Sequence, residues 1–203
     1  MNNDLVLASA SPRRIELLRR AGYDPEVRPY DVNESVEEEM KAEDFFARDA
    51  AETIARRKIR AALADIANAG KFIIAADTVV EAADGELLGK PKDRADARRM
   101  LHKLSGTCHH VHTGVAVAHA DNPYREGIMS VAVTSTITFR PLTDAEIDAY
   151  VDSGESDGKA GAYAIQEHGD KFVTSIEGEW DNIVGLPVKT VAELLQRQGY
   201  TKQ

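Results

Sequence analysis

The sequence predicts an α/β fold, because short apolar runs typical of strands alternate with helical patterns from one end of the chain to the other. No internal repeat, low-complexity segment or Pro/Gly/Ser-rich linker interrupts this alternation. The length of 203 residues suits one large domain or two lobes that share a core. Hydrophobic residues make up 43% and charged residues 29% of the chain, and both values are ordinary for a globular protein.

The first expected elements are a strand and the helix that follows it. The apolar run Leu5 to Ala8 predicts a short strand. Ser11 is suited to the N-cap of the next helix, and Pro12 to its first position, where a missing N–H is harmless. Gly22 is expected to end this helix in the left-handed conformation that glycine adopts readily.

The next expected elements are a long helix and a buried strand. The helix is predicted from roughly Ala42 to Ala67, with an apolar stripe that includes Ile59, Ala62, Leu63 and Ile66. The continuous apolar run Phe72–Ala76 predicts a strand that is buried on both faces.

A hairpin that turns at Asp84-Gly85 is expected next, between Thr78–Ala82 and Glu86–Leu88, and it is followed by a helix from about Arg94 to Leu104 that stops near Gly106. Two strands are then predicted at Val111–Ala118 and Ser130–Phe139, joined through Asn122–Gly127.

The last part of the chain is predicted to begin with a helix that is opened by the capping box Thr143–Glu146 and ends near Gly154. Shorter strand-like pieces follow Gly161, and a last helix runs from about Thr190 to Gly199.

Composition excludes several classes of protein. A single cysteine, Cys108, cannot form an intramolecular disulfide, and it favours a reducing compartment. The formal net charge of −9 argues against general nucleic-acid binding, which needs a basic face. The first residues lack the features of a signal peptide, and no apolar stretch is long enough to span a membrane. We therefore expect a cytoplasmic protein that binds neither nucleic acid nor membrane.

The segment Ser9 to Arg14 is the first candidate for chemistry. Arg13 and Arg14 lie in the first turn of the predicted helix, where the helix dipole disfavours cations. A bound anion would reverse this effect, and the small residues Ser9 and Ser11 would let a phosphate approach the backbone. From spacing alone, a surface helix with two solvated arginines explains the segment equally well.

Asp77-Thr78 is the second candidate, because ligands of α/β sheets gather at the carboxyl ends of strands. The Asp77 carboxylate could hold Mg²⁺ or act as a general base, and a turn-forming aspartate is the alternative.

Two lysines are further candidates. Lys58 lies on an apolar helix stripe, where its side chain must snorkel so that the ammonium reaches water, pair with an acidic group, or meet a ligand. Lys90, beside a rigid proline, carries little information by itself.

Glu34 and Gln166 are the remaining candidate site residues, whereas two neighbouring histidines are not. Glu34 precedes an acidic run that is typical of a solvated face. Gln166 ends a segment rich in glycine and alanine, and its amide could bind a base edge, although a tight structural turn is the alternative. His110 and His112 would share one face of a strand, but without further ligands they do not predict a zinc site.

Together these segments resemble the Maf family of nucleoside triphosphate pyrophosphatases, also called septum formation proteins. The matching pieces run in order along nearly the whole chain: LASASPRRIELL, DVNE, ARRK, AADTVV, LGKP, LSGTCHHVHTGVAV, FRPLTDAEIDAYV, GKAGAYAIQ and NIVGLP. The resemblance implies a single domain over residues 1–203, built as a mixed twisted sheet flanked by helices with two lobes around a cleft. It also implies a cytoplasmic enzyme, often a homodimer.

The activity implied by the resemblance is hydrolysis of a nucleoside triphosphate between the α and β phosphates, with a divalent cation, Mg²⁺ or Mn²⁺. Asp77-Thr78 and Gln166 resemble the branch that acts on dTTP and UTP. The family's proposed proton acceptor falls on Asp77, and its specificity positions fall on Arg13, Thr78 and Gln166. Asn33 departs from the family, since an acidic residue is common there, and its change removes one possible metal ligand.

The resulting hypothesis assigns a role to each candidate. Ser9, Arg13, Arg14, Lys58 and Lys90 hold the triphosphate, Glu34 and Asp77 hold the metal, Asp77 or Glu34 is the base, and Thr78 and Gln166 contact the pyrimidine. One alternative is the same chemistry on 7-methyl-GTP or another modified nucleotide. Another is a non-enzymatic regulator of septum formation, which would bind nucleotide tightly without turnover.

Overall fold

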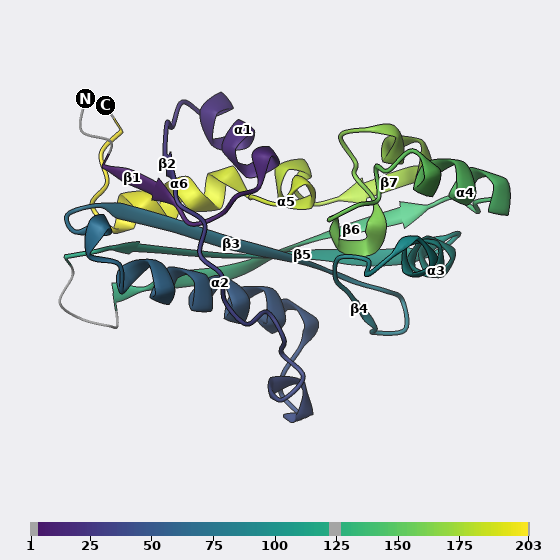
Figure 1. The fold of residues 1–203 in the computed structure, drawn as a ribbon, viewed down its shortest axis with the longest axis horizontal. Coiled ribbons are helices and arrows are strands. Elements are labelled where there is room, and N and C mark those ends of the chain that lie inside the picture. Colours follow the sequence, from purple (N-terminus) through teal and green to yellow (C-terminus); the bar gives the residue numbers. More distant parts are fainter. Residues whose placement is uncertain (1–3, 122–126, 203) are drawn as a thin grey trace. The chain divides into compact units, whose positions relative to one another are not determined.

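The computed structural model describes residues 4–121 and 127–202, and it confirms the α/β class (Figure 1). A seven-stranded mixed sheet has the order β2-β1-β3-β5-β6-β7, with β4 paired to β3 outside this path. The chain divides into two compact units, each built from separate stretches of sequence. Unit 1 comprises Met1–Asp77, Thr113–Val133 and Gly185–Gln203, and unit 2 comprises Thr78–His112 and Thr134–Val184.

The elements that belong wholly to unit 1 are β1 (Leu5–Leu7), α1 (Pro12–Arg20), β2 (Glu26–Val27), α2 (Ala47–Leu63), α6 (Val188–Arg197) and short 3-10 turns at Glu39–Lys41 and Ile66–Asn68. Three long strands contribute residues to both units: β3 (Phe72–Glu81), β5 (Cys108–His119) and β6 (Met129–Phe139). Strand β1 pairs in parallel with β2 on one side and with β3 on the other.

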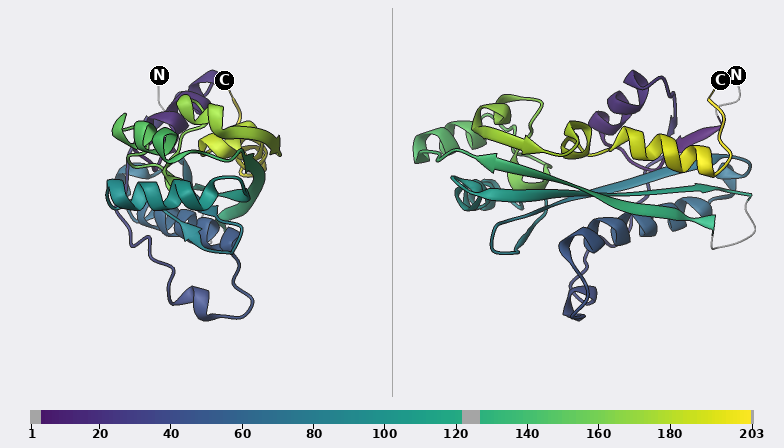
Figure 2. Two further views of the ribbon diagram at one scale, coloured as in Figure 1. Left: turned by 90° about the vertical axis from the view of Figure 1, so that its right-hand side faces the viewer. Right: turned by 180° about the vertical axis from the view of Figure 1, so that it is seen from behind.

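The sheet of unit 1 is covered by helices on both faces. Alternate strand residues Val6, Ile73 and Ala75 pack against Ala55 and Ile59 of α2. The intervening strand residues are equally buried, among them Leu5, Leu7, Ile74 and Ala76. Figure 2 shows why, since α2 and α6 lie on opposite sides of the strands. A strand with two covered faces must be apolar at every position, which is the pattern that predicted these strands.

Helix α1 confirms most of what its sequence predicts. Ser11 is the N-cap, although its hydroxyl makes no capping hydrogen bond, and Pro12 occupies the first helical position. Gly22 follows the last turn with a φ of 77°, in the left-handed region that favours glycine.

The predicted boundaries of α2 are wrong at both ends. The helix begins at Ala47, because the Asp49 carboxylate accepts the backbone N–H of Phe46 and caps the N-terminus there. It ends at Leu63, after which Asp65 caps a separate 3-10 turn. Ile66 therefore leaves the apolar stripe and is 90% exposed, which contradicts its predicted burial.

The two strand segments predicted on either side of Asp77, Phe72–Ala76 and Thr78–Ala82, form one continuous strand. Strand β3 continues through Asp77 and Thr78 as far as Glu81, where it pairs antiparallel with β4 (Leu87–Leu88). Aspartate is disfavoured in the interior of strands, but tertiary contacts outweigh this propensity at Asp77. The Asp77 carboxylate is paired with Lys58, so it has a cationic partner at its position within the sheet.

The elements that belong wholly to unit 2 are β4, α3 (Arg94–Leu104), α4 (Asp144–Asp152), 3-10 turns at Ala160–Ala162 and His168–Phe172, β7 (Val173–Glu177) and α5 (Trp180–Val184). The predicted hairpin at Asp84-Gly85 and the predicted bounds of α3 are confirmed. Of the strand-like pieces expected after Gly161, β7 alone is a strand among the described residues. The last helix begins at Val188 rather than Thr190, and the predicted connection at residues 122–126 lies outside the described part of the chain.

The capping box of α4 is present as predicted, and it supports a prediction about acid stability. Glu146 accepts hydrogen bonds from Arg140 and from Thr143, and these bonds lower the pKa of its carboxyl to about 2. Because the pKa of this carboxyl is lower in the folded state, the ionised Glu146 stabilises the fold at pH values above the ordinary pKa of glutamate. This stabilisation is lost as the pH falls toward 2. Glu146→Gln should therefore be less stable than the parent protein near neutral pH and should approach it in acid. Urea unfolding as a function of pH measures the difference, and a constant difference would contradict the assignment.

Across residues 4–121 and 127–202, no helix has both the length and the apolar character that crossing a membrane requires.

Candidate functional site

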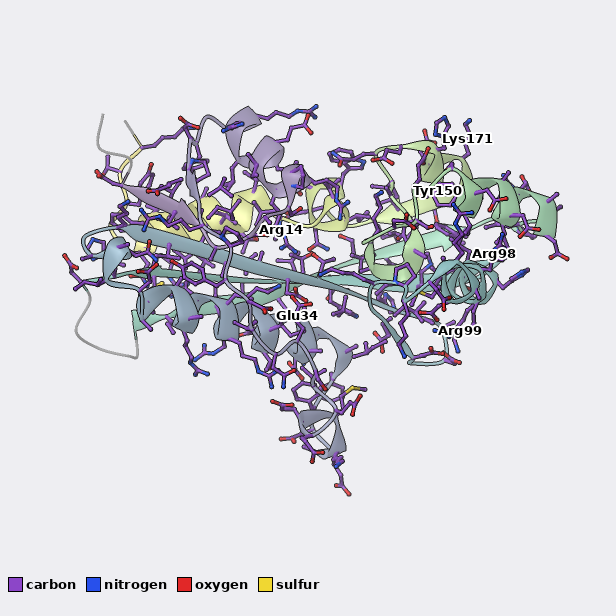
Figure 3. All side chains as sticks on the ribbon, viewed as in Figure 1. Arg14, Glu34, Arg98, Arg99, Tyr150 and Lys171 are labelled. Atoms are coloured by element: carbon purple, nitrogen blue, oxygen red, sulfur yellow. The ribbon has the colours of Figure 1, made fainter. Side chains whose placement is uncertain are left out.

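Lys58 forms the centre of a charged group in unit 1. Its Nζ lies 2.6 Å from Oδ1 of Asp77 and 2.7 Å from Oε1 of Glu34. The lysine comes from α2, and the aspartate comes from β3. The glutamate, which is labelled in Figure 3, comes from the loop before α2. The side chain of Lys58 is 10% exposed and that of Asp77 is 13% exposed, whereas that of Glu34 is 44% exposed. Of the three alternatives for Lys58, the structure shows pairing, since the ammonium contacts two carboxylates.

The two carboxylates converge on one positive charge, and this arrangement fits a divalent cation. Magnesium is commonly held by one or two carboxylates together with phosphate oxygens and water. Within the part of the chain that the structure describes, no group of three or more His, Cys, Asp or Glu side chains could hold a metal. A cation at Asp77 and Glu34 would therefore take its remaining ligands from substrate and solvent. The Asn33 side chain holds its own loop, because its Oδ1 accepts the backbone N–H of Ser35.

The position of Asp77 follows from the unequal lengths of two strands. Strand β1 pairs with β3 through Leu7 and Ile74, and Ala8 adds one more hydrogen bond to Ile74. The chain then turns away at Ser9 toward α1, while β3 continues to Asp77. Asp77 thus lies past the carboxyl end of β1, although it is inside its own strand. This is the edge of a parallel pair at which ligands of α/β proteins bind.

Arg14 is buried, which rules out the alternative of two solvated arginines at the start of α1. Arg14 as a whole residue is only 9% exposed. Its Nε donates to the carbonyl oxygen of Gly185 at 2.8 Å, and its Nη1 donates to Oγ of Ser9 at 3.0 Å. Ser9 is also 9% exposed, and its Oγ accepts the backbone N–H of Ser11. Arg14 therefore fixes the loop that enters α1.

The first turn of α1 and the Lys58 group influence one another electrostatically. Burial lowers the pKa of the Arg14 guanidinium, while the charges of Asp77 and Glu34 act in the opposite direction and raise it. Arg13, which is half-buried, lowers the pKa of Arg14 further by like-charge repulsion. Unit 1 therefore brings two arginines, a lysine and two carboxylates into one electrostatic neighbourhood, at a helix N-terminus that itself favours anions.

Arg57 is a contributor that the sequence does not single out. It precedes Lys58 on α2, and its Nη1 donates to the carbonyl oxygens of Asn33 at 2.9 Å and Ser35 at 2.6 Å. Its Nη2 is paired with Glu39. These contacts hold the backbone on both sides of Glu34, so adjacent residues of one helix fix both the loop and its carboxylate. The ARRK segment contained the signal, because Arg57 is part of it.

The other three candidates belong to unit 2. Thr78 is half-buried in β3, and Lys90 is exposed just after β4. Gln166 is half-buried and follows a buried run that ends at Ile165.

The histidines of β5 serve different purposes. Nδ1 of His110 lies 3.0 Å from Oγ1 of Thr136, and Nδ1 of His112 lies 2.9 Å from Oγ1 of Thr134. Nε2 of His112 lies 2.9 Å from the Glu81 carboxylate. These contacts are cross-strand hydrogen bonds. His109 is fully buried, a feature that alternation with buried Val111 could have indicated.

Comparison with known proteins gives a family match over most of the chain. A family model described as "Maf-like protein" matches residues 4–198. The relatives include a protein from Anaeromyxobacter sp. (strain Fw109-5) that is 46% identical over 97% of this chain and 90% of its own length. Another, from Geotalea uraniireducens, is 44% identical over 97% of this chain and 96% of its own length. Both relatives carry the name dTTP/UTP pyrophosphatase.

A solved structure from Mycobacterium abscessus, titled as a nucleoside-triphosphatase / dITP/XTP pyrophosphatase, is a more distant match. It is 15% identical, with a TM-score of 0.36, and the match covers 66% of this chain and 72% of that one. This similarity is too low to add to the family match.

Proposed function

The chain belongs to the Maf-like protein family, and on this premise we propose that it hydrolyses dTTP and UTP to the nucleoside monophosphate and pyrophosphate. The observation that carries the proposal is the charged group of unit 1. Lys58 binds Asp77 and Glu34 within the electrostatic reach of Arg14. Phosphoryl transfer needs cations for the phosphates and carboxylates for a metal, and this group supplies both. The names of the 44–46% identical relatives support the same substrates.

The phosphate grip that we propose consists of Ser9, Arg13, Arg14 and the backbone N–H groups at the start of α1. A nucleoside triphosphate carries about four negative charges, so that several local cations are needed to bind it. The burial of Arg14 removes the water that would otherwise weaken its interaction with an anion. Its bonds to Gly185 and Ser9 hold the guanidinium in place before substrate arrives.

Glu34 and Asp77 are the residues that we propose hold Mg²⁺ or Mn²⁺. When bound, such an ion polarises phosphate oxygens and neutralises charge on the leaving pyrophosphate. Asp77 orients or deprotonates the water that attacks the α-phosphorus, and the bond from the α-phosphorus to the bridging oxygen breaks. Asp77 is the more buried of the two carboxylates and lies on a strand, which supports its role as the base.

The other assignments from the family resemblance remain part of the proposal. Thr78 and Gln166 contact the pyrimidine, and Lys90 contacts the phosphates. A cytoplasmic location, a homodimer and a link to septum formation are expectations of the same kind. Size-exclusion chromatography with light scattering tests the dimer.

Pyrophosphate release is the test of the proposed activity. The protein is incubated with dTTP or UTP and Mg²⁺, and the products are separated and identified. Pyrophosphate and the monophosphate are expected, whereas orthophosphate release would refute the proposal. A panel that includes 7-methyl-GTP decides the substrate, since preferential turnover of that nucleotide would assign the chain to a different substrate class.

Arg57→Ala should reduce kcat/KM for dTTP roughly tenfold, because the loop that carries Glu34 loses its hydrogen bonds to α2. The Tm should change little, since Arg57 is only half-buried. Steady-state kinetics measure the loss, and Arg60→Ala is the matched control, an exposed arginine of the same helix. Equal kinetics in the two variants would remove Arg57 from the site.

A further inference from the structure

His109 is a fully buried histidine that the proposed function does not use. Its Nε2 lies 3.0 Å from the hydroxyl of Tyr163. Within the described residues, nothing hydrogen bonds to its Nδ1. Burial lowers the pKa of the imidazole to about 4, so that the ring is neutral at pH 7. A neutral imidazole in contact with Tyr163 forms one hydrogen bond and leaves one buried nitrogen unsatisfied.

The aromatic contacts of the His109 ring do not by themselves require a histidine. The imidazole contacts Phe139 edge to face at a centroid distance of 4.8 Å and Tyr163 at 5.6 Å. A phenyl ring makes the same kind of contact, and it has no unsatisfied nitrogen. The feature that phenylalanine cannot supply is the hydrogen bond to the Tyr163 hydroxyl. The imidazole therefore restrains Tyr163 rather than simply filling the core.

Tyr163 belongs to a backbone segment that is held in an unfavourable conformation. Gly161 has a φ of 69°, and Ala162 has a φ of 60°, which is disfavoured for a residue with a Cβ. A side chain on Gly161 would lie 3.0 Å from Val80. Such a conformation persists only where its surroundings determine it.

Three hydrogen bonds in unit 2 supply that restraint. The Gly161 N–H donates to the carbonyl oxygen of Gly89 at 3.1 Å. The Ala164 N–H donates to the hydroxyl of Tyr150, which Figure 3 labels, at 3.0 Å. The third bond joins His109 to Tyr163, between these two points. Of the three, it is the only one made entirely by side chains, so substitution can remove it without touching the backbone.

Gln166 needs such restraint if it is to distinguish pyrimidines. Its amide can donate to the 4-oxo group of uracil or thymine, and after rotation it can accept from the 4-amino group of cytosine. A mobile glutamine would therefore accept both bases, whereas a fixed one selects between them. Gln166 follows directly on Ile165, at the end of the buried run that contains Tyr163.

We infer that His109 is a positioning residue for base selection: through Tyr163 it fixes the segment Gly161–Gln166, so that Gln166 favours uracil and thymine over cytosine. The inference rests on the proposed function, since that function brings a pyrimidine to Gln166. It extends the function from the proposed site residues to a histidine of β5 that is not among them.

The test uses His109→Phe, Tyr163→Phe, the double variant and His109→Gln. We expect His109→Phe to remain folded and to lower the ratio of kcat/KM for UTP over CTP about tenfold. Tyr163→Phe and the double variant should show the same fall, because each removes the same bond. His109→Gln should restore most of the ratio, since its amide can still bond to Tyr163.

An unchanged ratio in a stably folded His109→Phe variant would overturn the inference. The inference would also be overturned if the double variant lost the UTP/CTP ratio by the sum of the two single losses in free energy, because such additivity is typical of independent sites. The parent protein separates this result from failure of the proposed function, which would appear as absence of pyrophosphate release from UTP and dTTP. The Tm shifts that UTP and CTP induce give a second measure of selection, and they need no turnover.

Discussion

Replacing Asp77 with asparagine is expected to lower kcat for dTTP about 10³-fold while the protein remains folded. The substitution removes the charge that binds a cation and the group that accepts a proton from water. It keeps the shape of the side chain, and Lys58 retains Glu34 as a partner at 2.7 Å. Steady-state pyrophosphate release measures the loss, and circular dichroism confirms the fold.

Asp24→Asn is the matched control for this experiment. Asp24 also belongs to unit 1, but its side chain is 83% exposed and its carboxylate lies 3.5 Å from Arg19. The control should keep the parent kcat. If Asp77→Asn retained more than about a tenth of the parent kcat, Asp77 would not be the base, since general-base groups contribute larger factors. Glu34→Gln would then be the variant to examine.

Gly114→Ala is expected to destabilise the fold by about 3 kcal/mol or more. Gly114 lies in β5, and a Cβ at this position would fall 2.3 Å from the backbone carbon and oxygen of Ala51 in α2. Those atoms cannot rotate away, so the helix would have to move off the strand. The buried packing of α2 on Ala116 and Ala118 of the same strand would be disturbed with it.

Thermal unfolding measures this effect, and a fall in Tm of about 10 °C is expected for a chain of this length. Gly89→Ala is the matched control for stability, because nothing lies within 4 Å of the Cβ it would gain. A Gly114→Ala variant as stable as this control would show that α2 can shift on β5 without loss of packing.

Much of the fold was predictable because the signals were local. The apolar run Phe72–Ala76, the capping box at Thr143 and the glycine after α1 depend on neighbouring residues, and each is confirmed. The continuation of β3 through Asp77 was not predictable, because it depends on Lys58, which is 19 residues away in the chain. The exposure of Ile66 has a local cause instead, since the adjacent Asp65 starts a new turn there, and helical periodicity alone does not reveal that turn.

The candidate site was predictable as a set of residues but not as an arrangement. The sequence indicated Lys58, Glu34 and Asp77 separately, and gave no sign that one ammonium binds both carboxylates. It left Arg14 open to a surface role, because burial by Gly185 involves a residue 171 positions away. Periodicity along a helix shows which residues share a face, and it does not show which distant loop covers that face.

The shared pairing of Lys58 has a consequence for how the protein exists without ligand. Two carboxylates that face one another repel, and many enzymes need a resident ion to hold such a pair together. Here a tethered ammonium acts as the counterion and offsets one of the two negative charges, so the pair stays assembled without an ion from solution. Any metal ion that binds at this pair must therefore compete with a cation that the protein never loses. An ion delivered together with a polyphosphate would bring new anionic partners for the displaced ammonium, so that the ammonium would not be left unpaired.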